Sequence, residues 1–177
     1  MTTSSSTNFE PNVTEFIEEA YERCGLELRT GYDLKTAIRS VNIMLAEWAN
    51  RGLNQWTIDQ DTQTVTQGTN EYTLNSNVID ILDVVIRRTV NNIQTDISVG
   101  RISRSEYLNI PNKQTQARPS QFFLDKSITP VLKVWPTPDN STDVIVFNKI
   151  IRMDDADAAN NTMDMPFRFF PCFTAGL

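Results

Sequence analysis

The chain has 177 residues, of which 40% are apolar and 9% aromatic, which is enough for a packed core and excludes disorder throughout. Its 22 acidic and 16 basic residues give a net charge of −6, which excludes a general attraction to nucleic-acid phosphates. There is no histidine, so serine–histidine and cysteine–histidine nucleophile systems are excluded, as are the most common zinc and iron sites.

The first predicted helix follows a short polar segment. Residues 1–10 are mostly small and polar, and we expect them to form a flexible N-terminal arm. Asn12, with Glu15 three residues later, is typical of a capping box, and Gly25 is a natural helix stop. Between these positions the apolar residues have the spacing of one helix face: Val13, Phe16, Ile17, Ala20 and Cys24.

A second helix is predicted to begin at Asp33, as its N-cap, and to end at Gly52. Its apolar stripe consists of Leu34, Ala37, Ile38, Val41, Leu45 and Trp48. The link between the two helices, residues 26–32, is short. We therefore expect the helices to pack as an antiparallel hairpin.

Residues 54–152 are predicted to form a β lobe, because they are rich in β-branched and aromatic residues interrupted by turn signals. A short helix over residues 105–110, capped by Ser103 or Ser105, is expected to interrupt the strands. Many short strands without long helices between them favour an antiparallel sandwich or open barrel. The predicted strands cover residues 56–59, 62–66, 71–74, 82–88, 93–98, 121–125, 131–135 and 143–152.

The end of the chain is predicted to return to the helices. Residues 153–164 form an acidic connecting loop, and residues 165–177 open an apolar helix, which we expect to continue beyond Leu177 in the natural chain. That helix would cover the face shared by the helices of residues 11–53. The predicted fold class is α+β: a small helical bundle, made of the N-terminal hairpin and the C-terminal helix, with an inserted antiparallel β-sandwich or barrel-like lobe.

Four glutamates crowd the polar side of the first helix: Glu15, Glu18, Glu19 and Glu22. Glutamates four residues apart repel one another, and Arg23 partly offsets this beside Glu19. A catalytic carboxylate pair would need burial to separate its two pKa values, and the pattern gives no sign of burial. We interpret the four as a solvated or channel-facing acidic face, and we predict no catalytic residues.

Two charged clusters fit structural roles better than ligand binding. The aspartates near the C-terminus lack the glycine and spacing of an EF-hand, so we predict a polar loop and no metal site, leaving only weak cation binding open. No glycine-rich loop accompanies the arginines of the β lobe, which favours salt bridges over a phosphate or cofactor site. The clusters are Asp154, Asp155, Asp157 and Asp164, and Arg87, Arg88, Arg101 and Arg104.

The aromatic and sulfur-containing residues are expected to be structural. Trp48, Trp56 and Trp135 could stack on sugars or bases, but core packing is the preferred interpretation. Cys24 and Cys172 lie among apolar residues, so we expect reduced, buried thiols. No apolar run reaches the ~20 residues of a membrane span, and the N-terminus lacks the features of a secretion signal. We therefore expect no membrane anchor and folding in the cytosol.

Several segments, taken in order, resemble the head-to-tail adaptor, or tail tubular, proteins of podoviruses, the short-tailed bacteriophages. The likeness covers most of the chain in matching order. The segments are LKTAIRSVNIMLAEWANRG (residues 34–52), TVTQGTNEYTL with VIDILDVVIR (64–74 and 78–87), RISRSEYLNIPNK (101–113), RPSQFFLD with KVWPTPD (118–125 and 133–139), and MPFRFFPCFTAGL (165–177).

The resemblance implies a structural virion protein that is not an enzyme, needs no cofactor and assembles in the host cytoplasm. It implies a dodecameric ring that joins the portal protein to the tail nozzle protein and extends the DNA exit channel. Genomic DNA would pass without sequence-specific binding, because a channel lined with carboxylates repels phosphates. Two alternatives stay open: a receptor- or carbohydrate-binding β module of a phage tail, and a hydrolase that uses Asp or Glu.

Overall fold

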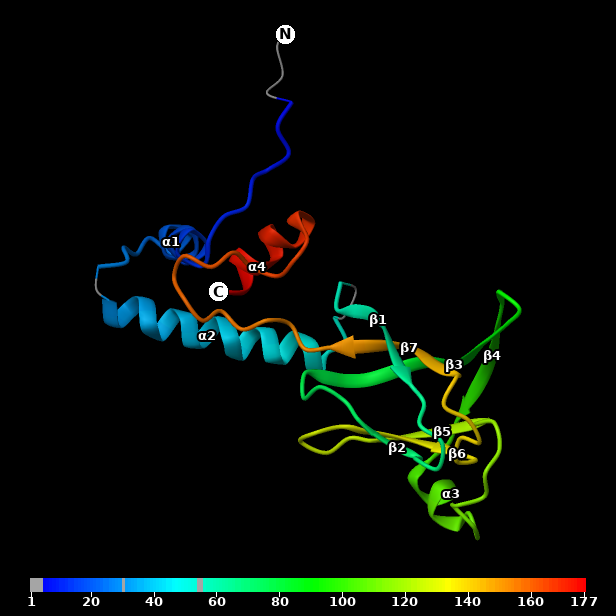
Figure 1. Ribbon diagram of the computed structural model, residues 1–177. Helices are drawn as coiled ribbons and strands as arrows, with labels where there is room; N and C mark the ends of the chain where they lie inside the picture. Colours follow the sequence, from blue (N-terminus) through cyan, green and yellow to red (C-terminus); the bar gives the residue numbers. More distant parts are fainter. Residues whose placement is uncertain (1–4, 30, 54–55) are drawn as a thin grey trace. The chain divides into compact units, whose positions relative to one another are not determined.

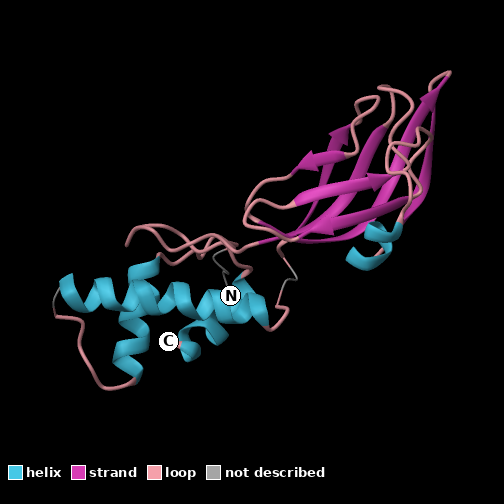
Figure 2. Cartoon of the chain, turned by 90° about the horizontal axis from the view of Figure 1, so that it is seen from below, coloured by secondary structure: helices cyan, strands magenta, loops and turns pink. Residues whose placement is uncertain are grey.

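The computed structural model describes residues 5–29, 31–53 and 56–177, which divide into two compact units (Figure 1). The helical unit consists of Met1–Trp56 with Met153–Leu177, and the β unit is Thr57–Arg152. Figure 2 shows helices in the first unit and strands, with one short helix, in the second. The predicted α+β class is confirmed. Residues 1–4 of the predicted arm, residue 30 of the interhelical link and residues 54–55 at the predicted start of the β lobe lie outside the described residues.

Helix α1 (Val13–Arg23) begins at the predicted capping box. The Glu15 N–H donates to the Asn12 side chain, and the Asn12 N–H donates to the Glu15 carboxylate at 2.8 Å. Four residues of the predicted apolar face are buried: Val13, Phe16, Ile17 and Ala20. Cys24 lies just beyond the helix as a free, exposed thiol, so the prediction of burial was wrong there. Cys24 is the C-cap of the helix, one residue after Arg23.

Helix α2 (Gly31–Asn50) begins two residues before Asp33, so the prediction that Asp33 is the N-cap was wrong. Asp33 lies in the first turn instead, where its carboxylate still interacts favourably with the helix dipole. The predicted stripe faces the core, with Ala37, Val41 and Leu45 buried and Leu34, Ile38 and Trp48 packed against it. None of the described helices is both long and apolar enough to cross a membrane.

The C-terminal segment fills the helical unit. A 3-10 turn, η1 (Phe167–Phe169), leads into the short helix α4 (Phe170–Gly176). Phe173 is completely buried, with its ring centroid 5.1 Å from that of Phe16 and 6.2 Å from that of Trp48. Cys172 points outward and is exposed, which corrects the prediction of burial. The terminal residues therefore supply the aromatic packing that the two N-terminal helices need.

The segment between the β unit and α4 is fixed to both N-terminal helices. Its apolar residues Met153 and Ala156 are buried. The Asn42 side chain accepts from the Ala156 N–H at 2.8 Å and donates to the Ala156 carbonyl at 3.2 Å. Val13 and Thr14, at the start of α1, donate their N–H groups to the carbonyls of residues 161 and 159. These bonds pair backbone groups that helix α1 cannot pair internally.

The β unit is one seven-stranded sheet in the order β1-β7-β3-β4-β5-β6-β2. Adjacent strands are antiparallel except β4 and β5, which make a two-residue parallel pair, so the sheet is mixed and not wholly antiparallel as predicted. It is a curled, half-barrel sheet. The strands are β1 (Ile58–Thr64), β2 (Glu71–Thr73), β3 (Val78–Val90), β4 (Ile93–Arg101), β5 (Gln121–Asp125), β6 (Val131–Trp135) and β7 (Val144–Ile151).

Two strands differ from the sequence prediction. Residues 58–64 form the single strand β1, where two strands were predicted, because the polar residues in its middle pair with β7 without a break. Strand β3 begins at Val78 and reaches Val90, well outside the predicted residues 82–88, and irregular register against β7 accommodates its extra length. The short helix α3 (Arg104–Asn109) is capped by Ser103, one of the two predicted caps.

The fixing of residue 156 by Asn42 gives a first prediction. Asn42→Ala removes both hydrogen bonds to Ala156, so the free energy of unfolding of the helical unit should fall by about 1–3 kcal/mol. Urea denaturation followed by far-ultraviolet circular dichroism measures this loss. Asn50→Ala, which removes an exposed asparagine from the same helix, is the control and should cost less than about 0.5 kcal/mol. Equal stability of the two variants would contradict the assigned role.

Candidate functional site

The four glutamates predicted as an acidic face all lie exposed on α1. Two of them already have local partners: Glu15 accepts from the Asn12 N–H, and Glu19 pairs with Arg23 at 2.8 Å. Within the described residues, Glu18 and Glu22 make no ion pair. The helix therefore keeps two solvated negative charges on one side, opposite the residues that it buries.

A groove of about 480 Å³ lies beside these glutamates, within the helical unit. Its lining includes the side chains of Glu15 and Glu19 together with four phenylalanines. The lining residues are Phe9, Pro11, Glu15, Phe16, Glu19, Arg23, Phe167, Phe170, Pro171 and Thr174. An exposed apolar groove with a charged rim is typical of a surface that binds another protein segment.

The aromatic floor of this groove is a continuous chain of edge-to-face contacts. Phe9 meets Phe167 with ring centroids 6.3 Å apart, Phe167 meets Phe170 at 5.5 Å, and Phe170 meets Phe16 at 5.0 Å. The outer pair is poorly covered, since Phe9 and Phe167 are each 67% exposed. This series of ring contacts thus extends from the buried core to solvent. It holds the N-terminal segment against η1. Sequence reasoning missed this groove.

The acidic residues near the C-terminus lie exposed on the stretch before η1. Asp154, Asp155 and Asp157 are exposed, because the intervening Ala156 and the preceding Met153 turn into the core. In the part of the chain that the structure describes, no group of acidic or cysteine side chains is placed to hold a metal ion.

Each of the four arginines singled out in the β unit pairs with a carboxylate. The interpretation as salt bridges is confirmed. The pairs are Arg87 with Asp96 at 2.7 Å, Arg88 with Asp143 at 2.7 Å, Arg101 with Asp80 at 2.8 Å and Arg104 with Asp125 at 2.5 Å. Burial raises the pKa of Asp80, but hydrogen bonds from Lys126 and Arg101 outweigh it and lower the pKa overall.

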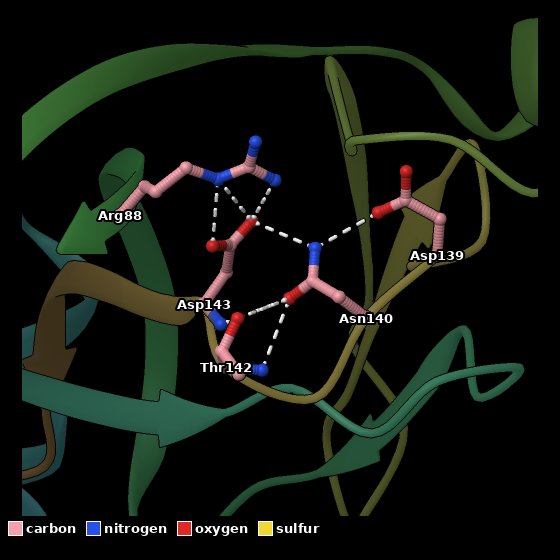
Figure 3. Close-up of polar contacts among 5 residues, drawn as sticks. All are labelled: Arg88, Asp139, Asn140, Thr142 and Asp143. Carbon is pink, nitrogen blue, oxygen red and sulfur yellow. Dashed lines mark hydrogen bonds and ion pairs between the residues drawn. The ribbon is translucent and has the colours of Figure 1, made fainter. Parts of the chain in front are cut away.

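The most buried of these pairs organises a loop (Figure 3). The side chain of Asp143 is only 2% exposed and accepts from Arg88 through Nε at 2.9 Å and Nη2 at 2.7 Å. Asn140 donates to Asp143 and to Asp139, while its oxygen accepts from the N–H groups of Thr142 and Asp143. The hydrogen bond from Arg88, chiefly, holds the pKa of Asp143 below its usual value. The network joins the loop before β7 to strand β3.

The tryptophans do not form a stacking platform. Trp48 and Trp56 pack against the core of the helical unit, with the Trp56 ring 4.3 Å from that of Phe169. Trp135 is half-buried in the β unit, and its indole N–H donates to the Asn112 carbonyl at 3.1 Å. Trp56 Nε1 is the only buried side-chain polar atom among the described residues without a hydrogen-bond partner.

The network around Asp143 predicts a pH dependence of stability. Because its pKa is lower in the folded chain than in the unfolded one, its ionised form stabilises the β unit above pH ~4, and that stabilisation is lost as the pH falls. Asp143→Asn should lower the free energy of unfolding by about 2 kcal/mol at pH 7 and by less at pH 3. Denaturant titrations at both pH values measure the difference. Asp83→Asn, an exposed position of β3, is the control, and an equal loss at both pH values for Asp143→Asn would contradict the assignment.

Comparison with known proteins identifies the family. A search of curated proteins finds no match to the chain. The family model described as SU10 adaptor protein matches residues 11–176, which is nearly the whole chain and includes both units. The predicted relationship to phage head–tail adaptors is confirmed, while the podovirus assignment stays a prediction. Proteins of this kind are structural components of the virion that contact other head and tail proteins, and they are not an enzyme class. The chain belongs to the SU10 adaptor protein family of phage head–tail adaptors.

Proposed function

We propose that the chain is a podovirus adaptor that assembles as a dodecameric ring between the portal protein and the tail nozzle protein. The ring extends the DNA exit channel of the virion and works without catalysis or a cofactor. It assembles in the host cytoplasm before or during tail attachment.

One observation carries this proposal: the adaptor family model spans residues 11–176 without leaving either unit unmatched. The succession of motifs in the sequence supports the finer assignment to podovirus adaptors. The surface chemistry agrees with a binding role, since the groove of the helical unit offers aromatic side chains and carboxylates to a partner segment. The alternative of a receptor- or carbohydrate-binding module receives no support from the tryptophans, which are packed or hydrogen-bonded inside their own units.

The acidic face of α1 is assigned to the channel wall. Glu18 and Glu22 are exposed and make no ion pair within the described chain, so their carboxylates are open to solvent. Twelve copies would form two rings of carboxylates around the DNA. Such a surface repels phosphates and lets the genome slide without sticking.

Ring formation itself requires two different patches on each subunit, because cyclic symmetry joins subunits head to tail. The N-terminal segment, whose Phe9 rests on Phe167, and the loops of the β unit are the proposed contacts to neighbouring copies, portal and nozzle.

Electron microscopy of the purified chain, alone and mixed with the portal protein of the same phage, tests the assembly. We expect a closed ring with twelvefold symmetry on the portal. A chain that stays monomeric in the presence of portal protein would overturn the proposed function, as would rings bound to glycan with no affinity for portal.

A charge reversal tests the channel wall. Glu18→Lys with Glu22→Lys makes the net charge of each subunit four units more positive. Assembled rings should therefore retain double-stranded DNA at about 50 mM salt and release it as the salt concentration rises. Filter retention of labelled DNA by rings of the variant and of the native chain measures this gain. Glu27→Lys with Glu47→Lys, reversals elsewhere in the helical unit, should leave retention unchanged. Equal DNA retention by the two double variants would contradict the assignment of α1 to the channel wall.

A further inference from the structure

The hairpin of β3 and β4 presents an open sheet edge. Strand β4 pairs with β3 from Ile93 to Val99, but it pairs with β5 only at Gly100 and Arg101. Figure 1 shows the hairpin extending past the ends of the neighbouring strands. Residues 93–96 and Ser98 are exposed. The outer edge of β4 therefore has no neighbouring strand over seven residues of the described chain.

The hydrogen-bond pattern identifies which backbone groups are open. The N–H of Gly100 donates to the Ser120 carbonyl at 2.9 Å, so the backbone groups of Gly100 point to the outer edge of β4. Backbone groups at every second residue of a strand point the same way. The unpaired N–H and C=O groups are accordingly those of Gln94, Asp96 and Ser98. An edge of this kind is a template for pairing with another strand.

A tight turn joins β3 to β4 at the tip of the hairpin. Its two turn residues, Asn91 and Asn92, have φ angles of 51° and 61°, as in the tight two-residue turn whose twist matches that of paired strands. The side chains that flank the turn are apolar and open, with Val90 55% and Ile93 68% exposed. Exposed β-branched residues at the tip of a projecting hairpin are expected to be covered in an assembly.

Strand β1, at one end of the same sheet, offers a second edge without a neighbouring strand in the described chain. Strand β1 is the terminal strand of the sheet, and it spans seven residues. The Ile151 N–H donates to the Thr57 carbonyl and the Val65 N–H to the Asp143 carbonyl, so odd-numbered residues face β7. The outward groups belong to Ile58, Gln60, Thr62 and Thr64. Strand β2, the other terminal strand, has only three residues and is too short to cover the open part of β4.

Strand direction favours pairing between copies. In the series β1-β7-β3-β4 every neighbour is antiparallel, so β1 and β4 run in opposite directions. The rotation that relates neighbouring copies in a ring keeps the strand directions of the series. When β4 of one copy lies beside β1 of the next, the two strands are therefore antiparallel. The charged side chains of both edges are already paired within the subunit, Asp59 and Asp61 with Lys149 and Asp96 with Arg87. A head-to-tail ring joins two different edges, so β4 of one copy does not pair with β4 of the next.

We infer that the open edge of β4 pairs with β1 of the neighbouring copy, so that one continuous sheet passes from subunit to subunit around the ring. This inference rests on the proposed ring. Two local hydrogen bonds on β1 would be exchanged on pairing: the Thr62 N–H donates to the Asp61 carboxylate, and the Gln63 amide donates to the Thr64 carbonyl. Both are between exposed groups, so replacing them by ladder bonds costs little.

Hydrogen exchange tests the inference on the unmodified chain. Peptides covering residues 93–99 and 58–64 are compared between free chain and isolated rings by mass spectrometry. We expect outward amides of both segments to exchange about tenfold or more slowly in the ring. Rings with unchanged exchange in the two segments would overturn the inference and leave the proposed function standing. Protection of residues 93–99 alone would overturn β1 as the partner. Failure to form rings under any condition would overturn both.

A proline substitution gives a second test. Ser98→Pro removes an outward N–H without removing a bond to β3, so the folded subunit should persist while ring mass is lost, as measured by light scattering. Thr73→Pro places the same change on the outward side of β2 and should leave the rings intact. Normal assembly of a folded Ser98→Pro chain would contradict pairing at this edge.

Discussion

The apolar face shared by α1 and α2 is closed by residues that lie more than a hundred positions further along the chain. Asn42 bonds to Ala156, which is 114 residues away, and Phe173 fills the space beside Phe16. Long loops are costly to close, but here the β unit closes the loop by its own pairing. Strands β1 and β7 are antiparallel neighbours, so the chain enters and leaves the sheet at one end, where Ile58 lies opposite Ile150. The inserted sheet thereby holds together the two halves of the helical unit.

Much of this architecture is readable from the sequence, because local signals decide it. The capping box at Asn12, the apolar stripe that includes Val41 and the cap at Ser103 each act within one or two turns, and each prediction is confirmed. What could not be read depends on partners distant in sequence. The polar strand β1 exists because β7 pairs with it along its whole length. The groove forms because Phe9 meets a residue at the other end of the chain.

The charged residues have two different roles in the two units. In the β unit, carboxylates such as Asp143 and Asp80 accept from arginine and lysine side chains, which lowers their pKa values and fixes loops to strands. On α1, Glu18 and Glu22 stabilise nothing that the described chain contains. Like charges four residues apart on one side of a helix cost a few tenths of a kcal/mol. Asp143 and Asp80 of the β unit are therefore paired within the fold, whereas Glu18 and Glu22 on α1 remain exposed.

The two sheet edges show how a subunit can stay separate until it assembles. On β1, local bonds at Thr62 and Thr64 occupy outward groups that would otherwise attract any strand. On β4, the outward groups remain open, but the side chains beside them are the polar ones of Gln94, Asp96 and Ser98, which discourage unspecific association. The edge of β1 is thus partly occupied by local bonds, and the edge of β4 is open but flanked by polar side chains. In the proposed ring on the portal protein, neighbouring copies are held close, so the entropy of bringing them together is already lost when the two edges pair.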